Sequence, residues 1–240
     1  MKILVVNDDS IHAPGIALLA QKASELGEVT VVAPASQCSA MSQKLSIHAA
    51  LHVEKADFPA AVKAAYQVSG TPVDCVKVAL QYILKEKPDY VFSGINDGYN
   101  VGYDIAYSGT MGAALEAVMN GIPAIAFSNT MNGSLALAEA HLVPIMRELI
   151  AKGQATGEVW NVNFPAVDPD ALKGILWDRP VAPLQFYSEN YVETKLADGS
   201  VHLKGQGAPL SDSSRVPAGT DIAAVMDGYI SIGKIKSMVL

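Results

Sequence analysis

The sequence predicts an α/β protein with a mostly parallel sheet and helices on both of its faces. Short apolar, β-branched runs, of which residues 3–6 are the first, alternate with longer segments of helical periodicity. The first helical segment covers residues 14–26, with Pro14 at its start and Gly27 at its end, the positions where these residues favour helix boundaries. Strands that alternate with helices imply right-handed crossovers and therefore a parallel sheet.

The next elements repeat this pattern. A second apolar run predicts a strand over residues 29–33, and a polar, serine-rich loop follows over residues 36–46. A helix is expected to start at Thr71, because a threonine followed by proline suits a helix N-terminus and an apolar stripe of helical spacing comes after it. Residues 90–92 are again continuous and apolar, which predicts another buried strand that leads into a long loop.

Two further helices and two further strands complete the expected core. A helix is expected over residues 110–120, closed by a glycine, and another over about residues 135–151. The apolar runs at 123–127 and 160–164 predict strands on either side of the second of these helices. The core is thus expected to span residues 1–170.

The last part of the chain has a different character. Residues 191–195 and 201–204 flank Asp198 and Gly199, a pattern that indicates a β-hairpin. We expect residues 171–240 to form a β-rich arm and a C-terminal segment used in oligomerisation, within a single-domain protein. The segment is too small to build a core of its own.

Composition excludes several classes of function. The formal net charge of -7 and the absence of a lysine and arginine cluster argue against a partner such as a nucleic acid polymer. Two cysteines provide neither a disulfide framework nor a zinc site. The N-terminus does not resemble a signal peptide, and no apolar stretch reaches membrane-spanning length. We therefore expect a cytoplasmic protein without membrane association.

The candidate functional residues follow three of the predicted strands. Asp8 and Asp9 come directly after the first strand, Ser39 and Ser42 follow the second, and Asn96 lies in the loop after the third. The carboxyl ends of parallel strands meet at one edge of the sheet, where ligands bind in open α/β folds. Carboxylate, hydroxyl and amide oxygens suit Mg²⁺ or Mn²⁺ better than zinc.

The two adjacent carboxylates cannot both face one ion if the strand simply continues, because successive side chains point to opposite faces. Either the chain turns sharply after Asp8 and Asp9, or one carboxylate binds the ion while the other orients water or substrate. A second feature is the predicted helix start at residues 107–110. Its free N–H groups and dipole could hold a phosphate, or Thr110 could simply cap the helix.

Several motifs then resemble one family. Asn-Asp-Asp-Ser-Ile-His-Ala-Pro-Gly at 7–15, Gly-Thr-Pro-Val-Asp-Cys-Val at 70–76, Ser-Gly-Ile-Asn at 93–96 and Tyr-Ser-Gly-Thr at 107–110 are similar to motifs of SurE. This is the stationary-phase survival protein family of metal-dependent nucleotidases. Val-Val-Ala-Pro at 31–34, Gly-Thr-Asp from Gly219 and Gly-Tyr-Ile-Ser from Gly228 extend the resemblance over almost the whole chain.

The resemblance implies a Rossmann-like core with an exchanged C-terminal arm, in homodimers or homotetramers. It implies hydrolysis of nucleoside 5′- and 3′-monophosphates, a small-molecule substrate, with some activity on short polyphosphate. Asp8 and Asp9 are the implied catalytic residues. The implied metal ligands are Asp8, Asp9, Ser39 and Asn96. The implied phosphate-binding residues are Asn100, Ser108, Gly109 and Thr110.

The chain departs from the family pattern at two positions. Ser10 stands where the family usually has glycine, and a Cβ is tolerated there only if the turn does not need a positive φ. The loop before Ser39 usually carries arginine, but residues 35–38 contain none. The missing cation affects the expected substrate preference or phosphate affinity rather than the metal site.

The hypothesis from the sequence is metal-assisted hydrolysis of a phosphomonoester, in which one of the two aspartates orients or deprotonates water. A nucleotide- or anion-binding regulatory module without catalysis is the alternative, but such a module has no use for clustered carboxylates. The roles of several other residues stay open. His12 is either a general acid or a structural histidine, and Cys38 carries either a reactive or a buried thiol. Asp97 and Asp104 are either solvated charges or groups that support the site. Tyr103 and Tyr107 either stack on a nucleobase or pack against the loop.

Overall fold

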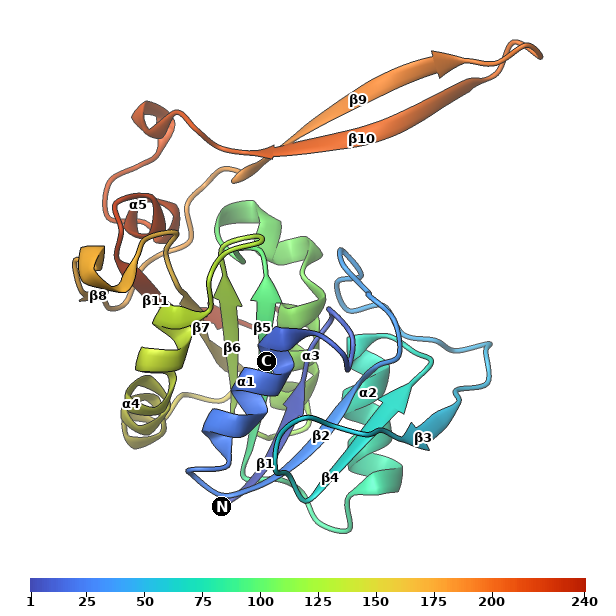
Figure 1. Cartoon of the computed structure of the whole chain (residues 1–240), viewed down its shortest axis with the longest axis vertical. Helices are drawn as coiled ribbons and strands as arrows, with labels where there is room; N and C mark the ends of the chain where they lie inside the picture. The colour runs from blue at the N-terminus through green and yellow to red at the C-terminus, as the bar shows by residue number, and fades with distance from the viewer.

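The computed structural model describes residues 1–240 and contains one nine-stranded sheet, with a separate two-stranded hairpin. The strand order of the sheet is β3-β4-β2-β1-β5-β6-β7-β11-β8 (Figure 1). All neighbouring pairs are parallel except β3 with β4 and β11 with β7. The predicted fold class is therefore confirmed. The strands are β1 (Lys2–Val6), β2 (Glu28–Pro34), β3 (Val53–Lys55), β4 (Ala64–Val68), β5 (Tyr90–Asp97), β6 (Ala124–Asn129), β7 (Glu158–Asn163), β8 (Ile175–Leu176) and β11 (Ile230–Lys236).

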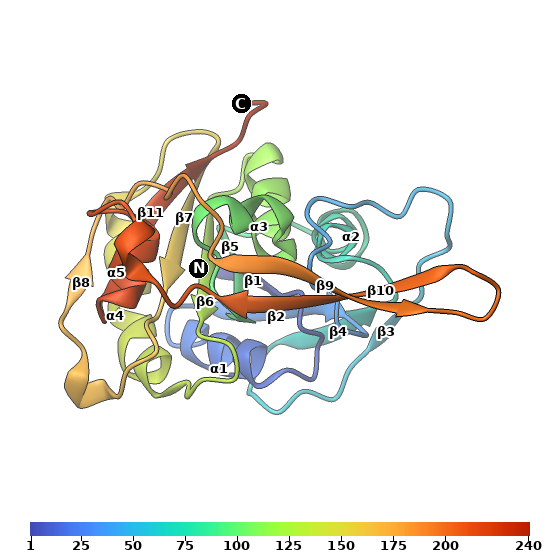
Figure 2. The same ribbon diagram turned by 90° about the horizontal axis from the view of Figure 1, so that it is seen from above.

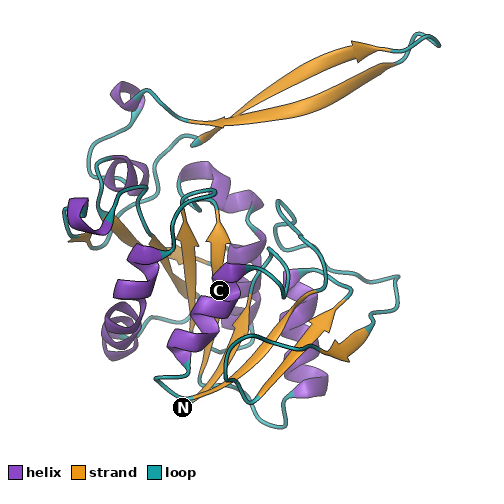
Figure 3. Ribbon diagram, in the orientation of Figure 1, coloured by secondary structure: helices purple, strands orange, loops and turns teal.

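Helices cover both faces of the sheet (Figure 3). Helices α1 and α4 contact each other on one face, and α2 and α3 contact each other on the other. Strand β1 shows why both faces need cover, since Ile3 and Val5 pack into one apolar core and Leu4 and Val6 into the second. The continuous apolar run thus behaves as a strand buried on both sides. The helices are α1 (Pro14–Ala23), α2 (Pro72–Val78), α3 (Gly109–Met119), α4 (Ala136–Lys152) and α5 (Asp221–Met226).

Some elements differ from their predicted extents. Helix α1 ends at Ala23, and α2 passes after Val78 into a π-helical turn. Strand β5 continues to Asp97, so Asn96 lies on the strand rather than in the loop. The loop itself contains a 3₁₀ helix, η2 (Gly102–Tyr107). Strand β4 escaped prediction because its alanines and glutamine have weak strand preference.

The C-terminal part of the chain contributes to the core as well as to the arm. Strand β11 returns to the main sheet beside β7, and β8 pairs with β11. Strand β11 requires glycine at position 233, because a Cβ there would lie 2.3 Å from the carbonyl oxygen of Arg179. The sheet therefore continues beyond residue 170, where the sequence placed the end of the core.

The arm is a long antiparallel hairpin of β9 (Tyr187–Lys195) and β10 (Val201–Pro209). Figures 1 and 2 show it reaching away from the body of the molecule above the carboxyl ends of the central strands. Every residue of β9 after Tyr187 and every residue of β10 is exposed. The predicted hairpin is present, and both of its strands extend further toward the root than the sequence pattern indicated.

No helix of the structure combines the length and the apolar character needed to cross a membrane.

Candidate active site

The predicted site residues gather where the direction of the sheet changes. Strand β1 lies between β2 and β5, and the chain leaves β1 and β5 toward helices on opposite faces of the sheet. Such a switch point opens a crevice at the carboxyl ends of the strands. A cavity of about 280 Å³ lies there, which we call the Asp8 cavity. Its lining includes five of the predicted residues: Asp8, Ser39, Asn96, Asn100 and Ser108.

Asp8 is the most buried carboxylate of the site, with 3% of its surface exposed. The hydroxyl of Thr110 donates a hydrogen bond to its Oδ1. Gly109 allows this close approach, because a Cβ there would lie 2.9 Å from the Cβ of Asp8. Burial raises the pKa of Asp8 to about 7, and the hydrogen bond from Thr110 opposes the shift. The carboxylate is therefore held in place but lacks a compensating positive charge.

Asp9 faces a different space. Its Oδ2 accepts a hydrogen bond of 2.8 Å from the backbone N–H of Asp97, and burial raises its pKa. It lines a neighbouring cavity of about 480 Å³, which we call the Asp9 cavity. Asn96 and Asp97 line both cavities, so the two cavities adjoin at the end of β5.

Ser10 adopts φ of +85°, so the turn after the aspartates does use the left-handed region. The turn is held by Asn7, whose Nδ2 donates to the carbonyl oxygen of Ser10 at 2.7 Å. The serine hydroxyl accepts a longer hydrogen bond, of 3.3 Å, from the N–H of His12. Serine at this position therefore carries backbone strain that glycine avoids.

Asn96 is aimed by a β-bulge. The pairing of β5 with β6 shifts register between Ser93 and Asn96. Within the bulge, Gly94 has φ of +129°, and a Cβ there would lie 2.2 Å from the carbonyl oxygen of Phe127. The side chain of Asn96 then donates from Nδ2 to the carbonyl oxygen of Gly98 at 2.7 Å, which leaves its Oδ1 as the available oxygen.

Asn100 is fixed by polar residues of the neighbouring strands. Its N–H donates to Oδ1 of Asn163 at 2.9 Å, and its Nδ2 donates to the hydroxyl of Ser128 at 2.8 Å. Its carbonyl oxygen accepts from the side chains of Asn161 and Asn163. Sequence analysis missed these three supporting residues. Buried asparagines in an apolar strand were the signal that could have identified them.

The start of α3 has a different division of roles from the one expected. Ser108, not Thr110, is the N-cap, because its hydroxyl accepts from the N–H of Met111 at 3.0 Å. The hydroxyl of Thr110 is engaged by Asp8, and the backbone of Thr110 also stabilises the ionised carboxylate of Asp8. The positive end of the helix therefore faces Asp8.

The residues whose roles were open now have definite places. His12 is exposed and lines neither cavity. Cys38 is buried, and burial raises the pKa of its thiol. Asp104 accepts hydrogen bonds from the N–H groups at the base of the arm. Tyr103 and Tyr107 are about half exposed, at 54% and 53%, and Tyr107 reaches the Asp8 cavity.

Gln37 occupies the loop where the family usually carries arginine. Its Nε2 lies 3.5 Å from Oδ1 of Asp9. A neutral amide thus stands near the aspartate in place of a positive charge.

The donor set fits a hard divalent cation. The atoms available for a cation are the oxygens of Asp8, Asp9, Ser39 and Asn96. Asn7, which precedes Asp8 in the sequence, has a buried Oδ1 without a hydrogen-bond partner. No group of three or more His, Cys, Asp or Glu side chains is placed to hold a metal. A cation here would therefore depend on the hydroxyl and the amide as well as on the two carboxylates.

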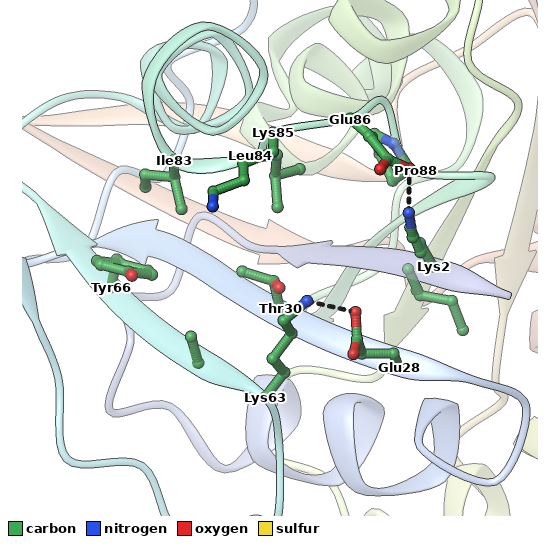
Figure 4. Close-up of a pocket in the computed structure, with 12 residues that line it drawn as sticks. Lys2, Glu28, Thr30, Lys63, Tyr66, Ile83, Leu84, Lys85, Glu86 and Pro88 are labelled. Atoms are coloured by element: carbon green, nitrogen blue, oxygen red, sulfur yellow. Dashed lines mark hydrogen bonds and ion pairs between the residues drawn. The ribbon is translucent and has the colours of Figure 1, made fainter.

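A second cleft, of about 330 Å³, lies at the amino ends of the strands (Figure 4). Its charged residues pair with one another, Lys2 with Glu86 and Lys63 with Glu28. None of the predicted site residues lines it.

Comparisons with known proteins identify the family of the chain. The family model described as Survival protein SurE matches residues 3–183. The "5′-nucleotidase SurE" of Flavobacterium psychrophilum is 40% identical over 98% of this chain and 91% of its own length. The "5′-nucleotidase SurE" of Neisseria gonorrhoeae is 38% identical over 98% of this chain and 92% of its own length. The crystal structure of the SurE protein from Aquifex aeolicus superposes with a TM-score of 0.83 at 34% identity, covering 98% of this chain and 93% of that one. The chain belongs to the SurE family.

Proposed function

We propose that this protein is a divalent-metal-dependent phosphomonoesterase that hydrolyses nucleoside 5′- and 3′-monophosphates. Its relatives carry the name 5′-nucleotidase, which supports the substrate class. The observation that carries the proposal is Asp8, a buried carboxylate without a compensating cation in a cavity shared with Ser39, Asn96, Asn100 and Ser108. A pure anion-binding module would place positive charge or N–H groups there instead.

The proposed metal ligands are Asp8, Asp9, Ser39 and Asn96, with Mg²⁺ or Mn²⁺ as the ion. When bound, the cation supplies positive charge to the phosphoryl group and makes water at the site more acidic. It would also compensate the negative charge that burial now makes costly at Asp8.

The residues of the chain itself position the substrate and move the proton. Asn100, Ser108, Gly109 and Thr110 form the proposed phosphate neighbourhood, in which the start of α3 favours negative charge. A carboxylate of the aspartate pair accepts the proton that the attacking water loses. The hydroxyl of Thr110 keeps the carboxylate of Asp8 in one orientation while this happens.

The breadth of the proposed substrate class follows from these contacts. The proposed residues address the phosphoryl group and not the alcohol that leaves. For this reason the proposal includes 3′-monophosphates and short polyphosphate together with 5′-monophosphates.

We also infer that the protein forms a homodimer or homotetramer through its arm. The hairpin exposes large apolar side chains, with Tyr191 65% and Leu203 60% exposed. Both outer edges of the two-stranded hairpin lack partner strands. Pairing with a second copy would cover both features.

The test of the proposed activity is phosphate release from AMP with Mn²⁺, and then with an excess of chelator. Asp9→Asn is the active-site variant, and Asp57→Asn, at an exposed position outside both cavities, is its matched control. Release should require Mn²⁺, should fall strongly in Asp9→Asn and should be unchanged in Asp57→Asn. Undiminished release in the chelator would refute metal dependence, and AMP binding without turnover would support the regulatory module.

A further inference from the structure

The root of the arm forms part of the wall of the Asp8 cavity. Tyr187, the first residue of β9, lines this cavity together with Asp8 and Asn100. It is the only residue of the hairpin to do so, since all later residues of β9 and β10 are exposed. The arm therefore begins inside the proposed active site, although its tip lies far from the body of the molecule (Figure 1).

The hydroxyl of Tyr187 holds the segment that carries two proposed site residues. Its oxygen accepts a hydrogen bond of 2.9 Å from the backbone N–H of Tyr99. The neighbouring Gly98 lies against the same hydroxyl, since a Cβ on Gly98 would be 3.3 Å from it. Residues 98–100 begin two positions after Asn96 and end at Asn100.

The two ends of this segment have other anchors. At one end the N–H of Gly98 donates to the carbonyl oxygen of Asn129 at 3.1 Å. At the other end Asn100 is bound by Asn161 and Asn163 of β7. The peptide N–H of Tyr99, midway between these anchors, has its acceptor on the arm and not on the sheet.

The root of the arm is itself firmly attached. The carboxylate of Asp104 accepts hydrogen bonds from the N–H groups of Phe186 and Tyr187, at 2.8 and 3.0 Å. The ring of Phe186 packs edge-on against Tyr99, with centroids 5.3 Å apart, and against Tyr187 at 5.0 Å. Burial raises the pKa of Tyr187 to about 12, so the phenol stays protonated.

We propose that Tyr187 is a positioning residue for residues 98–100, so that the root of the arm sets the shape of the phosphate side of the site. This inference rests on the proposed function. Tyr187 acts through Asn96, two residues before this segment, and through Asn100, the last residue of the segment. A displacement of the arm root would change the distance between these two side chains.

The test compares Tyr187→Phe with Tyr82→Phe in the full-length protein. Tyr187→Phe removes the acceptor for the N–H of Tyr99 but keeps the ring. Tyr82→Phe makes the same chemical change at an exposed tyrosine outside the arm and outside both cavities. The measurements are amide hydrogen exchange at Tyr99, the KM and kcat for AMP with Mn²⁺, and the melting temperature.

In Tyr187→Phe we expect exchange at Tyr99 to accelerate about tenfold or more, because its N–H loses its only acceptor. We expect kcat/KM for AMP and for a phosphomonoester without a base, such as p-nitrophenyl phosphate, to fall by a similar factor of about ten, since the change lies at the phosphate side. Tyr82→Phe should match the parent in all three measurements.

A variant with faster exchange at Tyr99 but unchanged kcat and KM would overturn the proposal, as would unchanged exchange. If the parent itself releases no phosphate, the proposed function fails. In that case the affinity for inorganic phosphate with Mg²⁺, measured by calorimetry in parent and variant, still tests the positioning role. If Tyr187→Phe does not fold, Asp104→Ala loosens the same root and should change exchange and kcat/KM in the same direction.

Discussion

Thr110 donates its side-chain hydroxyl to Oδ1 of Asp8, a hydrogen bond that joins the start of α3 to the end of β1 across 102 positions of the sequence. The bond replaces the capping role expected of Thr110, which Ser108 performs instead. It gives a buried carboxylate a fixed orientation toward a shared cavity. The central part of the proposed site is therefore a contact between two elements that the fold brings together.

Thr110→Val should lower activity more than stability. Valine keeps the shape but removes the donor to Asp8, so the carboxylate loses its fixed orientation. We expect a fall of about 10–100-fold in kcat for AMP and a loss of about 1–3 kcal/mol in the free energy of unfolding. Thr156→Val, at an exposed position without a side-chain hydrogen bond, is the control. Parental kcat in Thr110→Val would contradict the orienting role.

Asp8 should make the metal-free protein less stable as the pH rises. Its pKa is about 7 in the folded protein, against 3.8 when unperturbed, so between these values the folded state binds a proton that the unfolded state has released. The free energy of unfolding therefore falls as the pH rises through this window, by roughly 1.4 kcal/mol for each unit of pH. Below the window and above it the contribution of Asp8 is constant.

Urea unfolding at pH 5 and pH 8 in chelator measures this effect, with Asp8→Asn as the comparison. The parent should lose stability between the two pH values relative to Asp8→Asn, and Mg²⁺ should restore it at pH 8. Equal pH dependence in the two proteins would show that Asp8 does not titrate in this range.

Ser10→Gly should stabilise the protein. Ser10 has φ of +85°, which glycine adopts without the steric cost of a Cβ. We expect the free energy of unfolding to rise by about 0.5–1 kcal/mol. This net gain already subtracts the entropy cost of glycine and the loss of the weak hydrogen bond from His12. Ser24→Gly at the end of α1, where φ is −63°, is the control and should destabilise. A loss of stability in Ser10→Gly would show that the hydroxyl contributes more than the strain costs.

Removal of the outer arm should reduce the oligomer. A short glycine linker in place of residues 190–206 removes the exposed apolar side chains but keeps the buried Phe186 and the root at Tyr187. Light scattering should then report a smaller assembly than the parent forms. An unchanged mass would assign the interface to another surface.

The sequence predicted the elements whose side chains pack in regular patterns. Strand β1 could be located from its continuous apolar run, and helix α3 from its start signal and the glycine that follows it. Both signals depend only on residues that are neighbours in the sequence. The placing of Asp8, Ser39 and Asn96 around one cavity followed from the rule for parallel strands. The comparisons confirm the family resemblance and the fold, and the catalytic and metal roles stay predictions.

Other features depend on contacts between distant parts of the chain. Strand β11 pairs with β7 although the arm lies between them in the sequence, and its own sequence contains a glycine. Tyr187 enters the site from a segment that reads locally as one end of an exposed hairpin. The left-handed turn at Ser10 contradicts the local preference of serine. None of these could be read from periodicity.

The most direct test of the account is the initial rate of phosphate release from AMP at saturating Mn²⁺, in the parent and in Asp8→Asn. Asparagine keeps the size of the side chain but removes the charge that would bind the ion and accept a proton. The account predicts manganese-dependent release by the parent and a rate at least about a hundredfold lower in a folded Asp8→Asn. Equal rates in the two proteins would contradict it.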